Sequence, residues 1–388
     1  MTSRTKSKIL GAMFSAVIMA GIQAEQLRDR DFGYYVDIPE GFALVSASSD
    51  GKSYLFSHQE IPVSIVLKAE ETKGKSADKI LRGSLAKLSA EEETATFVWN
   101  GIGCAISSFS MTLEREFKGW GLCAPAEAGH SVIMLAYSPS EDWDSYWHII
   151  MSALNSLSTG PKNINSPGMI AQYAFPPEGR KNLALDINGT AVETSIDAGD
   201  TEAAEFVAEM EFSVLKLYSS HKLKEQAWKR YYRMIFRDSC GRLGRASEDI
   251  TKALYPAALR KNAASPETEI LRELLSWVQE LGYRRDNMTE YSTDFTVLPA
   301  VLEGTGNDCD SRSMMLCVLM SRTGTESILL VSPEFRHAMA AFRLDAPGQK
   351  FTADGKEYLM TETTDKLNPG TINADYADRK KWFAVSFD

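Results

Sequence analysis

The sequence lacks the short motifs that mark common nucleotide and metal sites. It has no P-loop, no Gly-rich dinucleotide turn and no paired Cys-x-x-Cys zinc ligands. Three of its five histidines, His58, His130 and His148, stand apart from one another. We therefore interpret them as solvated residues or residues at the edge of a core, and not as metal ligands. The sequence therefore predicts no cofactor and no metal site.

Long apolar runs are also scarce. The run nearest the start, residues 9–22, follows Lys6 and Lys8. A basic start, a short apolar core and the small residue Ala24 are typical of a cleaved secretory signal, and this core is too short for a membrane-spanning helix. We predict a signal over residues 1–24, no lipid anchor because no cysteine lies near the cleavage site, and a periplasmic or secreted product.

Basic residues are fewer than acidic ones, 42 against 52. The formal net charge is −10, and loss of the signal removes three further positive charges and no acid. Such an acidic chain is repelled by nucleic-acid backbones and by anionic membranes. The sequence therefore predicts neither as a partner, and no membrane span.

Cysteine is scarce, and the number of cysteines, five, is odd. Cys104 and Cys123 lie symmetrically about Leu113-Glu114, so a hairpin turning there would place them opposite each other. A disulfide between them and two separate core thiols both remain open. Cys240 and Cys317 are expected to be buried structural residues.

Two structured regions flank a segment rich in turn residues. Residues 25–160 alternate short strands with amphipathic helices predicted over about 76–88 and 141–157, which indicates an α+β sandwich on an antiparallel sheet. Residues 161–169 are rich in Gly, Pro, Asn and Ser and are predicted to be a linker. Residues 170–388 are then the second domain, also of the α+β class.

A helix predicted over residues 223–237 in this second domain has an aromatic side and a basic side. The basic side carries Arg230, Arg233 and Arg237. Because the aromatic residues are expected to face the interior, we interpret the arginines as a solvated face that forms ion pairs with this acidic chain.

The residues with the clearest chemical meaning lie in the last third of the chain. Gly306-Asn307-Asp308 forms a turn that leads into Cys309 and an apolar helix predicted to end near Thr323. Unpaired N–H groups and the positive dipole end at a helix start favour a thiolate over a thiol. The sequence therefore predicts a lowered pKa for Cys309 and a nucleophilic role.

A base and an orienting acid follow this cysteine. His337 opens a predicted strand that comes after the apolar strand 327–332, and Glu362 ends a strand that antiparallel pairing would lay beside it. His337 would accept the thiol proton, and Glu362 would orient its ring through the Nδ1 hydrogen. Asp365 is the competing acid.

These residues resemble a known family. The run 306–313, followed by His337-Ala338 and then Glu362-Thr363-Thr364, is similar to the bacterial transglutaminase-like superfamily, a papain-like group of cysteine hydrolases and acyl transferases. The resemblance covers about residues 265–388, the core of the second domain. It implies a papain-type α+β fold with Cys309 as nucleophile, and with the same histidine and glutamate as base and orienting acid.

The chain departs from the family pattern without losing a catalytic group. Asn307 stands where Gly is usual, Met339 where an aromatic residue is usual, and Glu362 where Asp is usual. The backbone N–H of Cys309 is a natural first oxyanion donor. The second donor remains open among three aromatic residues: Tyr283, Tyr291 and Trp277.

The first domain carries a second resemblance. The strand and turn Asp37-Ile38-Pro39-Glu40-Gly41-Phe42, the helix at 76–88 and the tryptophan-bearing last helix look similar to the PsbP-like fold, a small extracytoplasmic binding or scaffold domain. The resemblance implies a binding role for residues 25–160, and they contain no catalytic constellation.

Three functions follow from these patterns. The first is a cysteine hydrolase or acyl transferase acting on amide bonds, with a protein or peptide substrate as partner and cell-envelope components as a further candidate. The second is a catalytically silent transglutaminase-like binding or scaffold protein of the cell envelope. In the third, the PsbP-like domain is the functional binding module. The order and spacing of Cys309, His337 and Glu362 favour the first.

Overall fold

The computed structural model describes residues 26–283 and 293–387, and the chain divides into two compact units. Unit 1 comprises residues up to Ile164 together with 168–174 and 210–230, and unit 2 comprises 165–167, 175–209 and 231–388. Helices α5 (Asp200–Leu217) and α6 (Lys224–Arg242) contribute residues to both units. Antiparallel sheets and helices occur in each, so the predicted mixed α+β class is confirmed.

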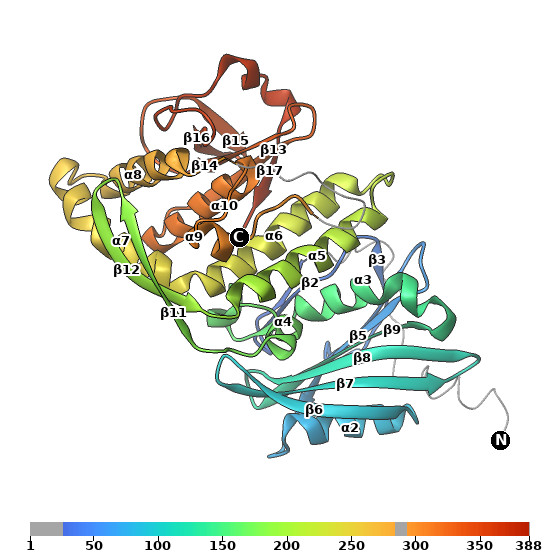
Figure 1. The fold of residues 1–388 in the computed structure, drawn as a ribbon. Helices are drawn as coiled ribbons and strands as arrows, with labels where there is room; N and C mark the ends of the chain where they lie inside the picture. The colour runs from blue at the N-terminus through green and yellow to red at the C-terminus, as the bar shows by residue number, and fades with distance from the viewer. Residues whose placement is uncertain (1–25, 284–292, 388) are drawn as a thin grey trace. The chain divides into compact units, whose positions relative to one another are not determined.

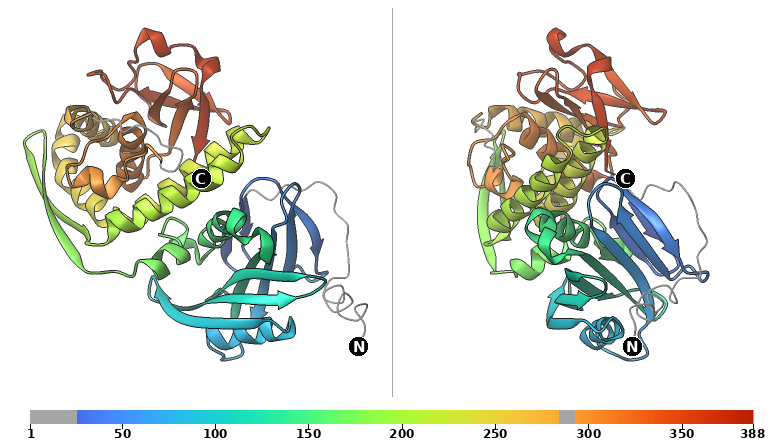
Figure 2. Two further views of the ribbon diagram at one scale, coloured as in Figure 1. Left: turned by 45° about the vertical axis from the view of Figure 1, so that its right-hand side comes forward. Right: turned by 90° about the vertical axis from the view of Figure 1, so that its right-hand side faces the viewer.

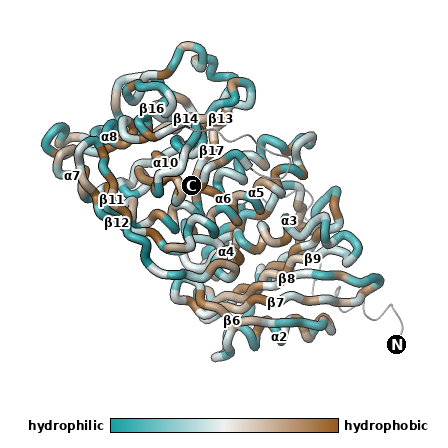
Figure 3. The backbone as a smooth tube through the Cα atoms, viewed as in Figure 1, coloured by the Kyte–Doolittle hydropathy of each residue, from teal (hydrophilic) through white to brown (hydrophobic). Residues whose placement is uncertain are grey.

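Unit 1 is built on a seven-stranded antiparallel sheet with the strand order β3-β4-β5-β9-β8-β7-β6 (Figure 1). The strands are β3 (Phe42–Ala47), β4 (Ser53–His58), β5 (Ser64–Glu71), β6 (Glu91–Trp99), β7 (Ile102–Thr112), β8 (Glu116–Pro125) and β9 (His130–Pro139). Figure 3 shows hydrophobic residues concentrated along β7, β8 and β9. This distribution is what a sheet covered by helices requires.

Two helices cover the sheet of unit 1. The apolar stripe of α2 (Ala77–Lys87), with Ile80 and Leu81, packs on Phe109 and Leu135 of the sheet. Helix α3 (Trp143–Asn155) contacts β8 and β9 from the other side (Figure 1). A smaller three-stranded sheet joins β1 (Gln26–Asp29), β2 (Tyr34–Asp37) and β10 (Ser158–Thr159), and α4 (Met169–Ala174) completes the unit.

The predicted placement of Cys104 opposite Cys123 is wrong. In the β7–β8 hairpin, Ala105 lies opposite Cys123. Successive side chains of a strand point to opposite faces, so this shift of one residue sends the two thiols to opposite faces of the sheet. Both cysteines are buried and free, and they are the separate core thiols that the sequence also allowed.

The predicted solvated arginine face of α6 is wrong at two positions. In unit 1 the Arg230 side chain is buried and donates to Glu211 at 2.6 Å and to the Asp37 carbonyl at 3.0 Å. In unit 2, Arg237 is also buried and donates to the Ser166 carbonyl at 3.1 Å. An arginine is tolerated inside when carboxylate and carbonyl oxygens accept its N–H groups.

Unit 2 contains a five-stranded antiparallel sheet with the order β15-β16-β14-β13-β17. Its strands are β13 (Ser327–Ser332), β14 (His337–Phe342), β15 (Lys350–Ala353), β16 (Lys356–Thr361) and β17 (Phe383–Ser386). Figure 2 shows these strands in red, beside the orange helix α10 (Cys309–Met320) that contacts β13 and β14. The predicted strand 327–332 is confirmed.

Helix α10 is the central element of unit 2. Every residue in it except Asp310 is buried, which is the pattern of a helix enclosed on all sides. It is contacted by α7 (Gly244–Lys261), α8 (Pro266–Glu280) and α9 (Leu298–Leu302). The hairpin of β11 (Arg180–Ile187) and β12 (Thr190–Asp197) lies against α7 and α8. No helix in the described part of the chain is long and apolar enough to cross a membrane.

Candidate active site

The start of α10 is held by a reciprocal cap. The Asp308 carboxylate accepts the backbone N–H of Ser311 at 3.0 Å, and the Ser311 hydroxyl accepts the backbone N–H of Asp308 at 2.9 Å. Such a capping box satisfies donors that a helix start leaves unpaired. It fixes Cys309 as the first residue of the helix.

The Cys309 thiol is enclosed and lies beside a carboxylate. The residue is 1% exposed, and its Sγ donates to Asp310 Oδ1 at 3.0 Å. Burial, followed by the charges of Asp310 and Asp308, raises the pKa of Cys309 well above its usual range. The predicted lowering is therefore wrong for the resting protein, because burial and two carboxylates outweigh the favourable helix start.

His337 and Glu362 form a buried pair. Strands β14 and β16 are antiparallel neighbours with Ala340 opposite Thr361, so the start of β14 and the residue after β16 come together. Nε2 of His337 lies 3.1 and 3.0 Å from the two carboxylate oxygens of Glu362. The prediction that the pair forms through Nδ1 is wrong: the ring presents Nε2 to the acid, which leaves Nδ1 for another partner.

The Glu362 carboxylate is held by further donors. Its Oε1 accepts the backbone N–H of Thr364 at 2.9 Å and the Thr364 hydroxyl at 2.8 Å. Burial alone would raise the pKa of Glu362, but the hydrogen bonds from His337 and Thr364 outweigh it and lower the pKa below the usual range. The competing acid, Asp365, instead accepts a hydrogen bond from Asn373 at 3.1 Å.

The packing of α10 on β14 brings the cysteine to the histidine strand. The Ser313 hydroxyl, one turn into α10, donates to the Ala338 carbonyl at 3.3 Å. The backbone N–H of Ala338, next to His337, favours the thiolate of Cys309 and partly offsets the rise in its pKa. Within the described residues, no hydrogen bond joins the thiol to His337.

An aromatic wall covers the histidine. The ring of Tyr376 stacks on His337 with centroids 4.4 Å apart, and the Trp382 ring meets His337 edge-on at 6.0 Å. Phe335 packs against both aromatic rings. These rings keep water from the His337–Glu362 hydrogen bonds. No motif marks them in the sequence, because they come from a turn and from the ends of two short 3-10 helices.

Arg312 links the segments that carry the site. Its guanidinium donates to the Asn307 side chain, to the Leu281 carbonyl and, at 3.0 Å, to the Thr363 carbonyl. It therefore joins the loop before Cys309, the end of α8 and the residue after Glu362. The only sequence signal for Arg312 is a charge inside an apolar helix.

The second oxyanion donor stays open. Trp277 lies on α8 and is 8% exposed, while Tyr283 is 52% exposed with the Arg312 guanidinium 5.3 Å from its ring centre. Tyr291 lies outside the described residues. The described residues also contain no cluster of three His, Cys, Asp or Glu side chains suited to a metal ion.

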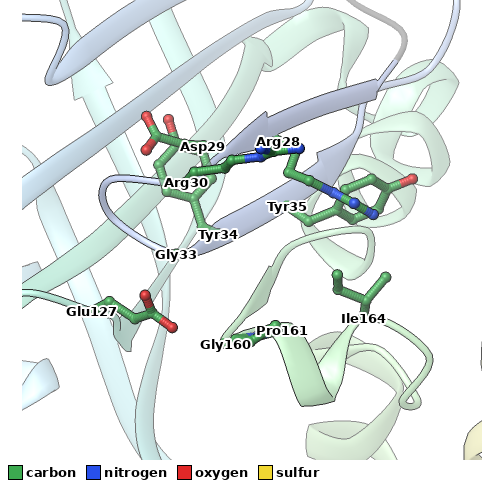
Figure 4. A pocket seen from close by; sticks show the side chains of 10 residues that line it. All are labelled: Arg28, Asp29, Arg30, Gly33, Tyr34, Tyr35, Glu127, Gly160, Pro161 and Ile164. Atoms are coloured by element: carbon green, nitrogen blue, oxygen red, sulfur yellow. The ribbon is translucent and has the colours of Figure 1, made fainter.

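Unit 1 has a cavity of about 240 Å³ at the end of its small sheet (Figure 4). Figure 4 shows Arg28 reaching over Tyr35, and the guanidinium carbon lies 5.8 Å from the ring centre. Arg30, Asp29 and Glu127 complete the charged lining. Because the lining contains two guanidinium groups and two carboxylates, its charge selects no class of ligand.

Comparison with known proteins gives only distant likenesses. No family model matches the chain, and no curated protein matches it in sequence. The cyanobacterial PsbP of Synechocystis is similar at 13% identity, over 37% of this chain and 98% of that chain, with a TM-score of 0.29. LpqN of Mycobacterium tuberculosis, described as involved in cell envelope biogenesis, is similar at 12% identity, over 35% and 90% of the two chains, with a TM-score of 0.27.

A third likeness spans more of the chain. A candidate protease from Parabacteroides distasonis is similar at 11% identity, over 84% of this chain and 69% of that chain, with a TM-score of 0.20. The N-terminal part of the chain thus has a distant resemblance to a PsbP-like fold. The transglutaminase-like resemblance of residues 265–388 stays a prediction, and none of these likenesses carries an activity to this chain.

Proposed function

We propose that the protein is a periplasmic or secreted cysteine hydrolase or acyl transferase that acts on amide bonds of protein or peptide substrates. Cys309 is the nucleophile, His337 the base and Glu362 the acid that orients the base. The observation that carries the proposal is the buried His337–Glu362 pair at the start of β14, the strand that packs against α10.

The proposed reaction uses the Cys309 thiol and Nδ1 of His337, the ring nitrogen that does not face Glu362. The thiol of Cys309 gives its proton to Nδ1 of His337, and the sulfur attacks the carbonyl carbon of the amide. Collapse of the tetrahedral intermediate breaks the C–N bond, and Nδ1 returns the proton to the leaving amine. Water or a second amine then displaces the sulfur from the thioester, yielding an acid or a new amide. The Cys309 N–H supplies one hydrogen bond to the oxyanion.

The raised pKa of Cys309 is compatible with this chemistry if proton transfer occurs in the substrate complex. A bound carbonyl adds new hydrogen bonds and changes the hydration of the site, so the resting ionisation does not fix the ionisation during reaction. A neutral resting thiol also protects the nucleophile from adventitious oxidation, because the thiolate is the form that oxidants attack.

The test is trapping of the acyl-enzyme. The protein is incubated with a casein digest and hydroxylamine, and hydroxamate products are counted by mass spectrometry; a parallel incubation with methylamine separates transfer from hydrolysis. We expect hydroxamates from the wild type and from Cys317→Ala, a buried cysteine away from the site, and none from Cys309→Ala. Equal product from wild type and Cys309→Ala would refute the proposal.

The proposed location has its own test. We expect the exported protein to have an N-terminus near Glu25, measured by intact mass. Recovery of a soluble product that retains Met1 would contradict export.

The alternative function is a catalytically silent binding or scaffold protein of the cell envelope. One observation favours it: the Cys309 thiol donates to Asp310 rather than to His337. Under this alternative a folded wild-type protein gives no hydroxamate with any peptide mixture, and binding to isolated cell-envelope material is unchanged by Cys309→Ala. If that binding is retained by residues of unit 1 alone, the PsbP-like part is the binding module.

A further inference from the structure

The carboxylate next to the nucleophile is bound on both of its oxygens. Asp310 Oδ1 accepts the Cys309 thiol at 3.0 Å, and Oδ2 accepts the hydroxyl of Tyr232 on α6. Tyr232 is 1% exposed, so its hydroxyl has little room to move. The carboxylate is therefore held in the orientation that receives the thiol proton.

This hydrogen bond competes with the proposed chemistry. A thiol has one proton, and a proton donated to Asp310 is not donated to Nδ1 of His337. A carboxylate at this distance also opposes formation of the thiolate, because the two negative charges repel each other. Asp310 and His337 are thus alternative partners of one group.

Two other charged groups near the thiol have hydrogen-bond partners of their own. The Asp308 carboxylate is engaged by Ser311 in the helix cap, and Arg312 donates to the loop residues described above. The groups whose charges act on the thiol come from three elements and the cap: Asp308, Asp310 and Arg312 at α10, Tyr232 on α6 and Tyr376 on η4 (Ala374–Tyr376). Under the proposed function, His337 on β14 is the further partner.

We infer, on the basis of the proposed function, that Asp310 is a positioning residue that holds Cys309 in a protonated resting state, and that Tyr232 fixes Asp310 for this task. Asp310 is the one residue of α10 that is partly exposed, so an incoming substrate can reach it. A substrate N–H that takes Oδ1 frees the thiol to turn to His337. The nucleophile is then activated only when the site is occupied.

The test follows the reactivity of Cys309 and needs no turnover. Iodoacetamide labelling of the wild type, Asp310→Asn and Asp310→Ser is measured against pH by peptide mass spectrometry, with Cys317 as the internal reference. We expect both variants to lower the labelling midpoint of Cys309 by about one pH unit or more, a roughly tenfold faster reaction at a given pH. Asp365→Asn, a matched carboxylate bound to Asn373, should leave the midpoint unchanged.

The outcomes separate this inference from the proposed function. Unchanged midpoints in both folded Asp310 variants, checked by thermal melting, would overturn the inference even if hydroxamates form. Lowered midpoints together with no hydroxamate from the wild type would keep the role of Asp310 and refute the proposed reaction. A lowered midpoint in Asp365→Asn of the same size would also overturn the inference, because the effect would then be one of overall charge.

Discussion

Two buried glutamates, Glu211 in unit 1 and Glu362 in unit 2, are each paired with a basic side chain, but their surroundings differ. Glu211 accepts Arg230 at 2.6 Å and the Ser152 hydroxyl at 2.8 Å. Burial dominates there and raises the pKa of Glu211 despite the arginine. At Glu362 the hydrogen bonds dominate and the pKa is lowered.

The two glutamates also differ in the chemistry of their partners. Arg230 is a permanent cation with several donors, and it ties together segments of unit 1. His337 has one nitrogen bound by Glu362, and under the proposed function its second nitrogen exchanges a proton with Cys309. If the proposed function holds, a buried carboxylate pair is reactive only when its partner keeps a titratable atom in reach of a nucleophile.

The largest expected effect breaks the structural pair. Arg230→Ala leaves Glu211 buried without its cation, and we expect a loss of about 3–5 kcal/mol in the free energy of unfolding by urea denaturation. Arg343→Ala is the control, because Arg343 pairs with Glu326 with 58% of its side chain exposed and should cost about 1 kcal/mol or less. Equal losses of unfolding free energy in the two variants would contradict the distinction between the buried pair and the exposed pair.

The second effect breaks the pair of His337 and Glu362. Glu362→Gln should lower the rate of hydroxamate formation by roughly a hundredfold, because the imidazole loses the acceptor that orients it, and His337→Ala should cost at least as much. Both variants should remain folded, as circular dichroism would show. A strong loss in Asp365→Asn with a silent Glu362→Gln would reassign the orienting acid, and silence in both would favour the binding protein.

A third experiment sharpens the contrast through pH. The raised pKa of Glu211 means that the folded state binds the extra proton, so its contribution to stability falls as pH rises above 4.5, the usual value. The lowered pKa of Glu362 gives a contribution that is present above 4.5 and is lost as pH falls below it. Urea denaturation of Glu211→Gln and Glu362→Gln against wild type, between about pH 3 and 7, should give differences of opposite slope. Parallel slopes would contradict the assignment.

The smallest effect concerns the cysteines of the two units. Because Cys104 and Cys123 point to opposite faces of their sheet, a reducing agent should leave the melting temperature unchanged, whereas loss of a real disulfide costs about 2–5 kcal/mol. Thiol titration after denaturation, without reductant, should find five free thiols. A count of three would show that a pair forms after export.

Local structure was predictable where one element contains its own signals. The apolar run 327–332 is strand β13 within the same bounds, and the helix predicted over 76–88 is α2, Ala77–Lys87. The turn Asn188-Gly189 joins β11 and β12, because both residues adopt a positive φ, 50° and 85°, as a tight hairpin turn requires. Each of these signals acts over a few neighbouring residues.

The sequence predicted one contact of the candidate site but not its electrostatics. His337 and Glu362 were placed side by side from strand order, and the structure brings them within hydrogen-bond distance. The ring nitrogen that faces the acid was predicted wrongly, and so was the direction of the Cys309 pKa shift. The aromatic wall of Tyr376 and Trp382 had no sequence signal.

Local signals in the sequence predict the α+β class, the turn that leads Cys309 into a helix, the strand that His337 opens and the strand that ends just before Glu362. These predictions follow from hydrophobic periodicity and turn residues, which are signals that act over a few neighbouring residues. Long-range packing sets the burial of Arg230, the faces of the sheet to which Cys104 and Cys123 point, and the partner of the Cys309 thiol. The faces of the cysteines depend on strand register, and a shift of one residue reverses them. The burial of Arg230 and the partner of the thiol depend on burial and charges from distant segments, where a single carboxylate can change the outcome.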